Sequence, residues 1–452
     1  MHDLSTTLAA VASAPGRGGV ACIRVSGPDA YRVAAGLFRS KRHYELPGDG
    51  RPLFGSFVGT DTAALDHGFL VAFTPGRAFT GEPTVELWTH GSPPVLQALL
   101  RVAVALGATL AGPGEFTYRA LRHGRLDLPR AEAIRDLIDA RTIHQARMAL
   151  AQAEGALSRR LGPLREALID LAARGEAAVE FADESETHLE DGAFRKGVGT
   201  ALHAARSLLE EGRRGRVIRD GARVVLAGVT NVGKSSIFNR LVGRDRAIVS
   251  SAPGTTRDTL EETIDVAGIP VTLVDTAGRR ASDDAIESEG MRRARAAAGT
   301  ADMLIRVIDA TRPLTADEED DLRGDAAAAV PVIVVVNKID AAPAREPIAA
   351  PPGAIPLSAA DGEGFPSLCE AIVRGLAGAP TLEQPLVSSA RHLASLDTIV
   401  TSLAAARESA GLGVELALED VRSALSELDE LIGRVGGDDL YDRIFSTFCI
   451  GK

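Results

Sequence analysis

The sequence lacks the features that would indicate a secreted or membrane-spanning protein. It has only three cysteines, Cys22, Cys369 and Cys449, and their wide spacing indicates neither a disulfide framework nor a CxxC metal site. The longest apolar run, residues 326–336, is short and contains Pro331, which favours a buried strand over a membrane span. The N-terminus does not show the basic-then-apolar pattern of a secretory signal. We therefore expect a cytoplasmic protein.

Lysine is also scarce. Five of the 50 basic residues are lysines and the other 45 are arginines; the lysines are Lys41, Lys196, Lys234, Lys338 and Lys452. The two cations are not interchangeable at a tight binding site, so the few lysines mark positions to inspect. The net charge of −11 argues against non-specific nucleic-acid binding by the whole surface, although local basic patches remain. We interpret two arginine clusters, residues 213–219 and 292–295, as solvated helix faces or a domain junction.

A chain of 452 residues is too long for one hydrophobic core, which predicts two or three domains. Residues 1–123 alternate short apolar stretches with glycine and proline, and we expect an α+β domain there. Residues 124–216 carry apolar stripes at helical spacing, as do residues 380–452, whereas residues 217–379 alternate strand and helix signals typical of a parallel α/β sheet. The economical interpretation is an all-α helical domain in two pieces with the α/β domain inserted, although two separate bundles would give the same pattern. Arg306, inside an expected strand, fits only as an edge or partner contact.

A phosphate-binding loop is recognisable in the α/β domain. Gly228-Val-Thr-Asn-Val-Gly233-Lys234-Ser235 follows an expected strand and precedes an expected helix. Glycines let backbone N–H groups turn toward phosphates, and the helix N-terminus adds a favourable dipole. We expect Lys234 to neutralise the β- and γ-phosphates and the Ser235 hydroxyl to bind Mg²⁺. Alone, this pattern would also fit an ATPase.

Three further segments indicate a guanine nucleotide. Asp275-Thr276-Ala277-Gly278 ends the next expected strand and suits Mg²⁺ and γ-phosphate contacts. Asn337-Lys338-Ile-Asp340 closes another strand, and the Asp340 carboxylate can accept two hydrogens that guanine offers and adenine lacks. Ser358-Ala359-Ala360 can contact the base from its backbone. The order of these motifs predicts a GTPase whose nucleotide site comprises Asn231, Val232, Gly233, Lys234, Ser235, Ser236, Ser250, Ser251, Ala252, Pro253, Gly254, Thr255, Thr256, Asp275, Thr276, Ala277, Gly278, Asn337, Lys338, Asp340, Ser358, Ala359 and Ala360.

The activation of water must differ from that of small GTPases. Those proteins place a glutamine directly after the Asp-x-x-Gly motif, whereas this chain has Arg279 there. Thr256 stands where the first switch loop belongs, and we expect it to supply a second hydroxyl to Mg²⁺.

With these residues in hand, the chain resembles the MnmE (TrmE) family of tRNA-modifying GTPases over essentially its full length. The similarity rests on Ile23-Arg24-Val-Ser-Gly27, Thr80-Gly-Glu-Pro-Thr-Val-Glu86-Leu87, Pro113-Gly-Glu-Phe116 and the terminal Phe448-Cys449-Ile-Gly-Lys452. The resemblance implies a homodimer with a folate-binding N-terminal domain. It also implies an FAD-dependent partner subunit of the MnmG/GidA type, with which the dimer forms a heterotetramer that modifies the 5-position of wobble uridine (U34) in tRNA.

The resemblance also assigns cofactors. A 5-formyl- or 5,10-methylene-tetrahydrofolate would contact Arg24, Glu86, Arg125 and Lys452, although Arg125 replaces the family's usual lysine. A K⁺ ion held by Asn231, Ser250, Ala252 and Thr255 would replace the missing glutamine, and Glu287 would orient the water. Without the resemblance, Glu287 would be interpreted as an exposed glutamate. Cys449 is either a catalytic thiol near the one-carbon unit or a packing residue.

Two other functions fit the same motifs. One is a GTPase of ribosome assembly whose folate-like features are only scaffold. The other is a folate-dependent one-carbon transferase that uses GTP as a signal.

Overall fold

The computed structural model describes residues 3–41, 44–46, 50–180, 191–244, 260–275, 301–325, 330–342, 350–378, 386–435 and 437–451. The chain forms two compact units. One contains Met1–Arg135, Gln152–Arg159 and Ser426–Lys452, and the other contains Asp136–Ala151 and Arg160–Leu425. Within the described ranges, no helix combines the length and the apolar character that crossing a membrane requires.

The first unit is built on a seven-stranded sheet in the order β3-β4-β5-β6-β2-β1-β7. Its neighbouring strands are antiparallel except β1 and β7, which are parallel. The strands are β1 Leu8–Val11, β2 Gly18–Ser26, β3 Phe38–Arg39, β4 Leu53–Val58, β5 Ala64–Phe73, β6 Thr84–Gly91 and β7 Thr109–Leu110. The prediction of an α+β domain is therefore confirmed.

Alternation along β6 separates the two faces of this sheet. Val85 and Leu87 are fully buried, whereas Trp88 is partly exposed. The buried face packs against helices α1 (Ala30–Leu37) and α2 (Pro93–Ala105), whose Val33 and Leu99 join the same core. Glu86 and Trp88 consequently project from the opposite face, as the two-residue period of a strand requires.

The C-terminal tail packs against helix α3 within the first unit. Helix α14 (Asp438–Phe445) packs with α3 (Glu115–Arg122), and Tyr118, Tyr441, Phe445 and Phe448 form one buried aromatic cluster. Burial of each such ring stabilises the docked state by about 2 kcal/mol. Ile450 does not take part in this cluster, because its side chain is exposed.

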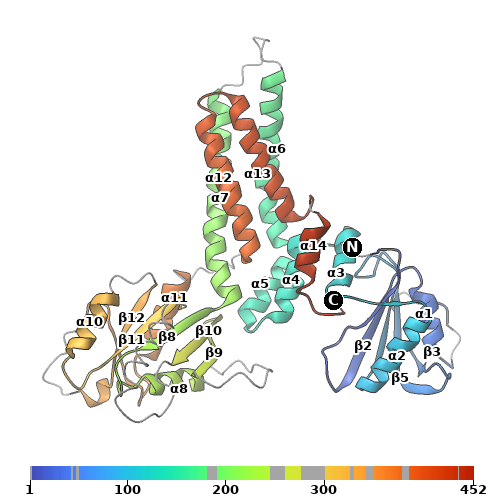
Figure 1. The fold of residues 1–452 in the computed structure, drawn as a ribbon, viewed down its shortest axis with the longest axis horizontal. Helices are drawn as coiled ribbons and strands as arrows, with labels where there is room; N and C mark the ends of the chain where they lie inside the picture. The colour runs from blue at the N-terminus through green and yellow to red at the C-terminus, as the bar shows by residue number, and fades with distance from the viewer. Residues whose placement is uncertain are drawn as a thin grey trace. The chain divides into compact units, whose positions relative to one another are not determined.

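The helical domain is formed by segments on both sides of the α/β domain. Its helices are α4 Leu128–Asp139, α5 Ile143–Ala153, α6 Ala156–Glu180, α7 Asp191–Asp220, α12 Ala390–Ser409 and α13 Val414–Ile432. Helices α7 and α12 run alongside each other (Figure 1), and Arg422 on α13 forms an ion pair with Glu176 on α6. This pairing of early with late helices confirms the insertion and removes the alternative of two separate bundles.

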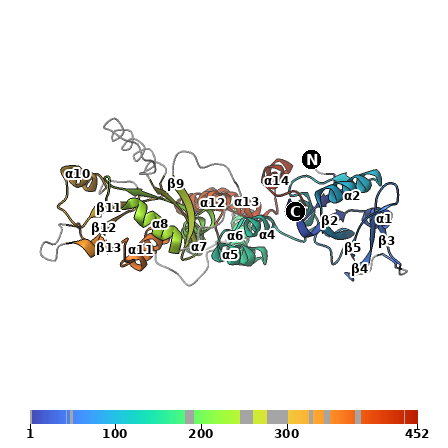
Figure 2. The same cartoon turned by 90° about the horizontal axis from the view of Figure 1, so that it is seen from below.

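The inserted domain holds a six-stranded sheet in the order β13-β12-β11-β8-β10-β9. The strands are β8 Ala222–Ala227, β9 Leu260–Val266, β10 Ile269–Asp275, β11 Met303–Asp309, β12 Val332–Asn337 and β13 Ile355–Leu357. The sheet is parallel as predicted, except for β9, an antiparallel edge strand that its alternating polar sequence did not reveal. Helices α8 (Lys234–Arg244) and α11 (Phe365–Ala377) contribute to one core cluster with β8 and β10, and Figure 2 shows both helices beside the sheet.

Arg306 corrects one expectation. Strand β11 lies inside the sheet between β12 and β8, so the edge interpretation is wrong. The Arg306 guanidinium instead donates to Asp325 at 2.7 and 2.8 Å and to Asp321 at 2.6 Å, both on helix α10 (Ala316–Asp325). The charge is therefore neutralised within the domain and fixes α10 against the sheet.

Candidate functional site

The glycine-rich loop stands between β8 and α8, at the carboxyl edge of the parallel sheet. Gly228 and Gly233 both have positive φ, at 147° and 100°, and a Cβ at Gly228 would lie 2.4 Å from the Val307 carbonyl oxygen. Only glycine fits such positions. The Lys234 ammonium donates to the Gly228 and Val229 carbonyls, each at 2.8 Å, and burial lowers its pKa. The cation thus lies inside the loop, where phosphates would sit.

The Mg²⁺-binding residues predicted on two elements meet in the structure. The Ser235 hydroxyl at the start of α8 donates to the Asp275 carboxylate at the end of β10, at 2.7 Å. Asp275 is fully buried, whereas Ser235 is exposed. A hydroxyl and a buried carboxylate at one point form an oxygen donor set of the kind that Mg²⁺ prefers.

Asn337 and Lys338 connect the segment predicted to contact the base, residues 358–360, with the phosphate loop. The Asn337 amide donates to the Val232 carbonyl at 2.8 Å and accepts from the Ala359 N–H at 3.1 Å. Lys338 donates to the Asn231 carbonyl at 2.8 Å and pairs with Asp309 at 2.6 Å. Burial alone would raise the pKa of Asp309, but hydrogen bonds from Lys338 and Thr311 hold it below its ordinary value. The structure therefore brings together the loop and two strand ends, with Asp340 exposed beside them.

Sequence reasoning missed Arg240, which organises the third segment of the site. Its guanidinium, on α8, donates to the carbonyls of Ala359, Ala360 and Asp361 at 3.1, 2.6 and 2.6 Å, and it lies over the Phe365 ring. An arginine at the seventh position of a helix carries no motif signal, because its partners are backbone groups more than 100 residues away.

Several predicted residues lie outside the described ranges. These are the switch-loop and Mg²⁺ residues Ser250, Ser251, Ala252, Pro253, Gly254, Thr255 and Thr256, the Thr276-Ala277-Gly278 segment, Glu287 and Lys452. Their assignments stay predictions.

In the first unit, the structure places two predicted folate residues in contact. Arg24 on β2 donates from Nε and Nη2 to Glu86 Oε1 at 3.2 and 2.9 Å. Its guanidinium also lies over the Phe79 and Phe116 rings. Arg125 is exposed beside Gly81, and among the described residues no polar contact joins it to Arg24 or Glu86.

The C-terminal tail contacts Arg24 and the start of helix α3. Arg24 Nη1 donates to the Gly451 carbonyl at 3.4 Å, and the Gly114 N–H donates to the Cys449 carbonyl at 3.3 Å. Gly451 has φ of 95°, and a Cβ there would meet the Val11 carbonyl oxygen. Cys449, two residues before Gly451, is exposed.

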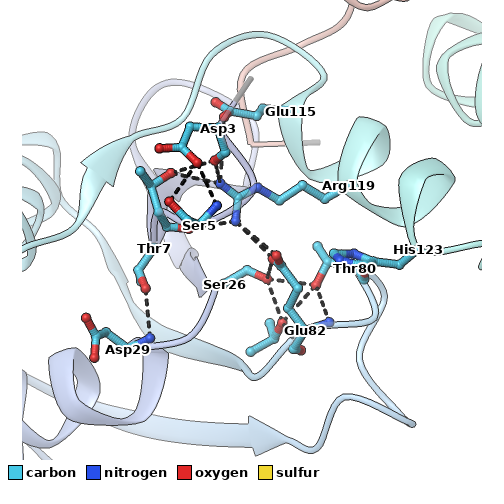
Figure 3. Close-up of polar contacts among 12 residues, drawn as sticks. Asp3, Ser5, Thr7, Ser26, Asp29, Thr80, Glu82, Glu115, Arg119 and His123 are labelled. Atoms are coloured by element: carbon cyan, nitrogen blue, oxygen red, sulfur yellow. Dashed lines mark hydrogen bonds and ion pairs between the residues drawn. The ribbon is translucent and has the colours of Figure 1, made fainter. Parts of the chain in front are cut away.

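A buried polar network around Arg119 joins several segments of the first unit (Figure 3). Arg119 on α3 is fully buried and donates to both oxygens of Glu82 at 3.1 Å and to the Asp3 and Thr6 carbonyls at 3.0 and 2.7 Å. Ser26 joins it from β2 by donating to Glu82 at 3.3 Å. The network fixes the N-terminal segment, the start of β6 and α3, which carry or adjoin Arg24, Glu86 and the tail contacts.

The arrangement in the inserted domain, with Lys234 inside a loop that leads into a helix and an Asn-Lys-x-Asp segment fixed to that loop, defines a P-loop GTPase. Comparisons with known proteins narrow the class. Residues 128–449 match the model described as the MnmE helical domain, and residues 7–125 match the model described as the GTP-binding protein TrmE N-terminus. The chain belongs to the MnmE family of tRNA modification GTPases.

Curated relatives agree over the full length. A tRNA modification GTPase MnmE from Chloroflexus aurantiacus is 41% identical over 463 residues, covering 99% of this chain and 100% of the relative. Another from Azoarcus sp. is 41% identical, covering 98% of each. Among solved structures, the G domain of the T. maritima FeoB iron transporter is 27% identical to this chain, with a TM-score of 0.26, and the match covers 34% of this chain and 97% of that one.

Proposed function

We propose that this chain is a K⁺-activated GTPase that modifies the 5-position of wobble uridine U34 in tRNA, using a tetrahydrofolate one-carbon unit and an FAD-dependent partner subunit. Membership of the tRNA modification GTPase family supports the reaction class. The observation that carries the GTPase part is the convergence of Lys234, Ser235 and Asp275 at one edge of the inserted sheet. A cytoplasmic location goes with this proposal, since tRNA is found there.

In the nucleotide site, each described residue has a distinct task. Lys234 exchanges its two loop carbonyls for phosphate oxygens, a stronger, charge-assisted contact. Ser235 and Asp275 hold Mg²⁺, with Thr256 as a further hydroxyl donor. Asp340 selects guanine, because its exposed carboxylate accepts from two base hydrogens.

K⁺ activation rests on Asn231 in the phosphate loop. The backbone φ of Asn231 is 64°, which is unusual for a residue other than glycine. Its backbone carbonyl accepts a hydrogen bond from Lys338. The side chain is exposed, so its amide oxygen can serve as a hard ligand for K⁺. Ser250, Ala252 and Thr255 complete the proposed ion site, and Glu287 orients the water. The ion supplies positive charge near the transferring phosphoryl group.

The folate site is proposed around Arg24, Glu86, Arg125 and Lys452. A cation suits the ligand's glutamate tail and a carboxylate suits the donor edge of its pterin. Arg24 and Glu86 lie on one face of the sheet, and the tail docked there presents an exposed Cys449. We propose that Cys449 acts as the thiol near the one-carbon unit. The homodimer and the FAD-dependent subunit of the heterotetramer are proposed from the family.

Nucleoside analysis of bulk tRNA tests the proposal. Cells deleted for this chain should lose the U34 modification, and the wild-type chain should restore it. Lys234→Ala and Arg24→Ala should each fail to restore it, whereas Asn239→Ala, an exposed change on α8, should succeed. Intact U34 modification in the deletion together with defective ribosomal subunit profiles would contradict the proposal and favour the ribosome-assembly function.

A further inference from the structure

We infer that Trp88 is a ligand-contacting residue of the proposed folate site, with its indole N–H orienting Glu86 and its ring packing against the flat pterin. This inference rests on the proposed function, which assigned no role to this residue. Trp88 is the single tryptophan of the chain, and 39% of its surface is exposed. A large aromatic ring left open to solvent on a sheet face is a feature that a bound molecule would explain.

Strand register places Trp88 beside the Arg24–Glu86 pair. Glu86 lies opposite Arg24 on β2, and Trp88 lies two residues farther along β6, on the same face. The indole Nε1–H donates to Glu86 Oε2 at 3.2 Å. The ring is therefore adjacent to the carboxylate and near the guanidinium that contacts the C-terminal tail.

Glu86 is oriented by both neighbours without being saturated. Arg24 engages Oε1 and Trp88 engages Oε2, so the carboxylate plane is fixed. Each carboxylate oxygen has two lone pairs; the two hydrogen bonds from Arg24 occupy those of Oε1, so acceptor capacity remains on Oε2. A pterin offers a flat conjugated ring and an edge of N–H donors. An oriented carboxylate beside an aromatic ring matches both features, because flat heterocycles stack on aromatic side chains.

Three exposed aromatic residues, Trp88, Phe69 and Phe54, form a row across neighbouring strands that leads away from Arg24 and Glu86. Phe69 lies opposite Trp88 on β5, and Phe54 lies opposite Phe69 on β4. The two phenyl rings are arranged edge to face, with their centroids 5.4 Å apart. Phe54 lies on β4, two strands away from Trp88. The residue opposite it on β5 is the apolar Phe69, and 62% of the Phe54 surface is exposed. It therefore offers a matched control on the same face, and a contact with a second copy of the chain through this row is the competing explanation.

The single tryptophan makes the test direct. We would titrate the full-length wild-type chain with 5-formyl-tetrahydrofolate, following tryptophan emission with correction for absorption by the ligand, and measure binding in parallel by equilibrium dialysis. Emission should change in proportion to bound ligand. In dialysis, Trp88→Leu should weaken binding about ten-fold, within the range for stacking of a heterocyclic base, and Trp88→Phe should weaken it less because the ring remains. Phe54→Leu should bind like the wild type.

Three results would overturn the inference, and a fourth would overturn the proposed function instead. Ligand binding with unchanged emission, or wild-type affinity in Trp88→Leu, would show that the ring does not contact the ligand. An emission shift on dilution without ligand would assign Trp88 to a contact between subunits. Absence of any folate binding by the wild-type chain would contradict the folate site itself.

Discussion

Arg240 holds Ala360 in place: its guanidinium, on the helix that follows the phosphate loop, donates to the Ala360 carbonyl at 2.6 Å. The same group also donates to Ala359 and Asp361, so one side chain sets the backbone of the segment proposed to contact the guanine. The helix that begins with Lys234 thus connects the phosphate loop to the segment proposed to contact guanine.

Arg240→Met should weaken GTP binding about ten-fold, because an unfixed Ser358–Ala360 segment must be ordered when the base binds. Methionine keeps the apolar stem over Phe365 and removes only the donors. Titration with a fluorescent GTP analogue measures the effect, with Asn239→Ala on the same helix as the control. Unchanged affinity in Arg240→Met would show that the segment is ordered without it.

Base selection should reside in Asp340. Asp340→Asn should weaken GTP and improve xanthosine triphosphate, whose 2-oxo group accepts a hydrogen bond where the guanine amine donates one. Competition between the two nucleotides for wild type and variant measures the switch. If both proteins rank the nucleotides alike, guanine is read by another group.

The sequence predicted the elements whose signal is local. The phosphate loop and the Asn337-Lys338 segment each lie where a strand ends, as their short sequence patterns predicted. Helix α6 was harder to predict, because Gly162 and Pro163 suggest a break in a helix. In the structure, Pro163 lies inside a helix that runs from Ala156 to Glu180. Contacts between distant segments were not predictable. Arg306 pairs with carboxylates on a neighbouring helix, and Arg119 pairs with Glu82, which lies 37 residues away in the sequence.

Cys449 and Cys22 should differ sharply in their reactivity toward iodoacetamide. Cys449 is exposed and should react readily at pH 8, whereas Cys22 is buried, and this burial together with the nearby Glu86 carboxylate raises its pKa to about 12. Mass spectrometry of timed samples should show modification of Cys449 well before Cys22. Equal rates would contradict the burial of Cys22 in strand β2.

Cys449→Ser should abolish tRNA modification while GTP hydrolysis and folate binding persist, since the thiol is proposed to act only on the one-carbon unit. Nucleoside analysis, a phosphate-release assay and dialysis separate these three properties. Survival of U34 modification in this variant would remove Cys449 from the chemistry.

Arg119 should contribute mainly to stability. Arg119→Met leaves the Glu82 carboxylate buried without its partner and should lower the free energy of unfolding of the first unit by about 3 to 5 kcal/mol. The double variant Arg119→Met with Glu82→Met should recover much of this loss, because no buried charge remains unpaired. Thermal denaturation of the three proteins measures both effects, and a single variant as stable as the wild type would show that the pair is not buried as described.

The GTP hydrolysis rate in K⁺ buffer compared with Na⁺ buffer at equal ionic strength tests the central claim most directly. We predict fast turnover in K⁺, at least ten-fold slower turnover in Na⁺, and an Asn231→Ala variant that is slow in both salts yet binds GTP nearly as well as the wild type, since the ion stabilises charge mainly in the transition state. Equal wild-type rates in the two salts would contradict the K⁺ mechanism and assign the missing positive charge to an arginine, with Arg279 or Arg280 as the candidates.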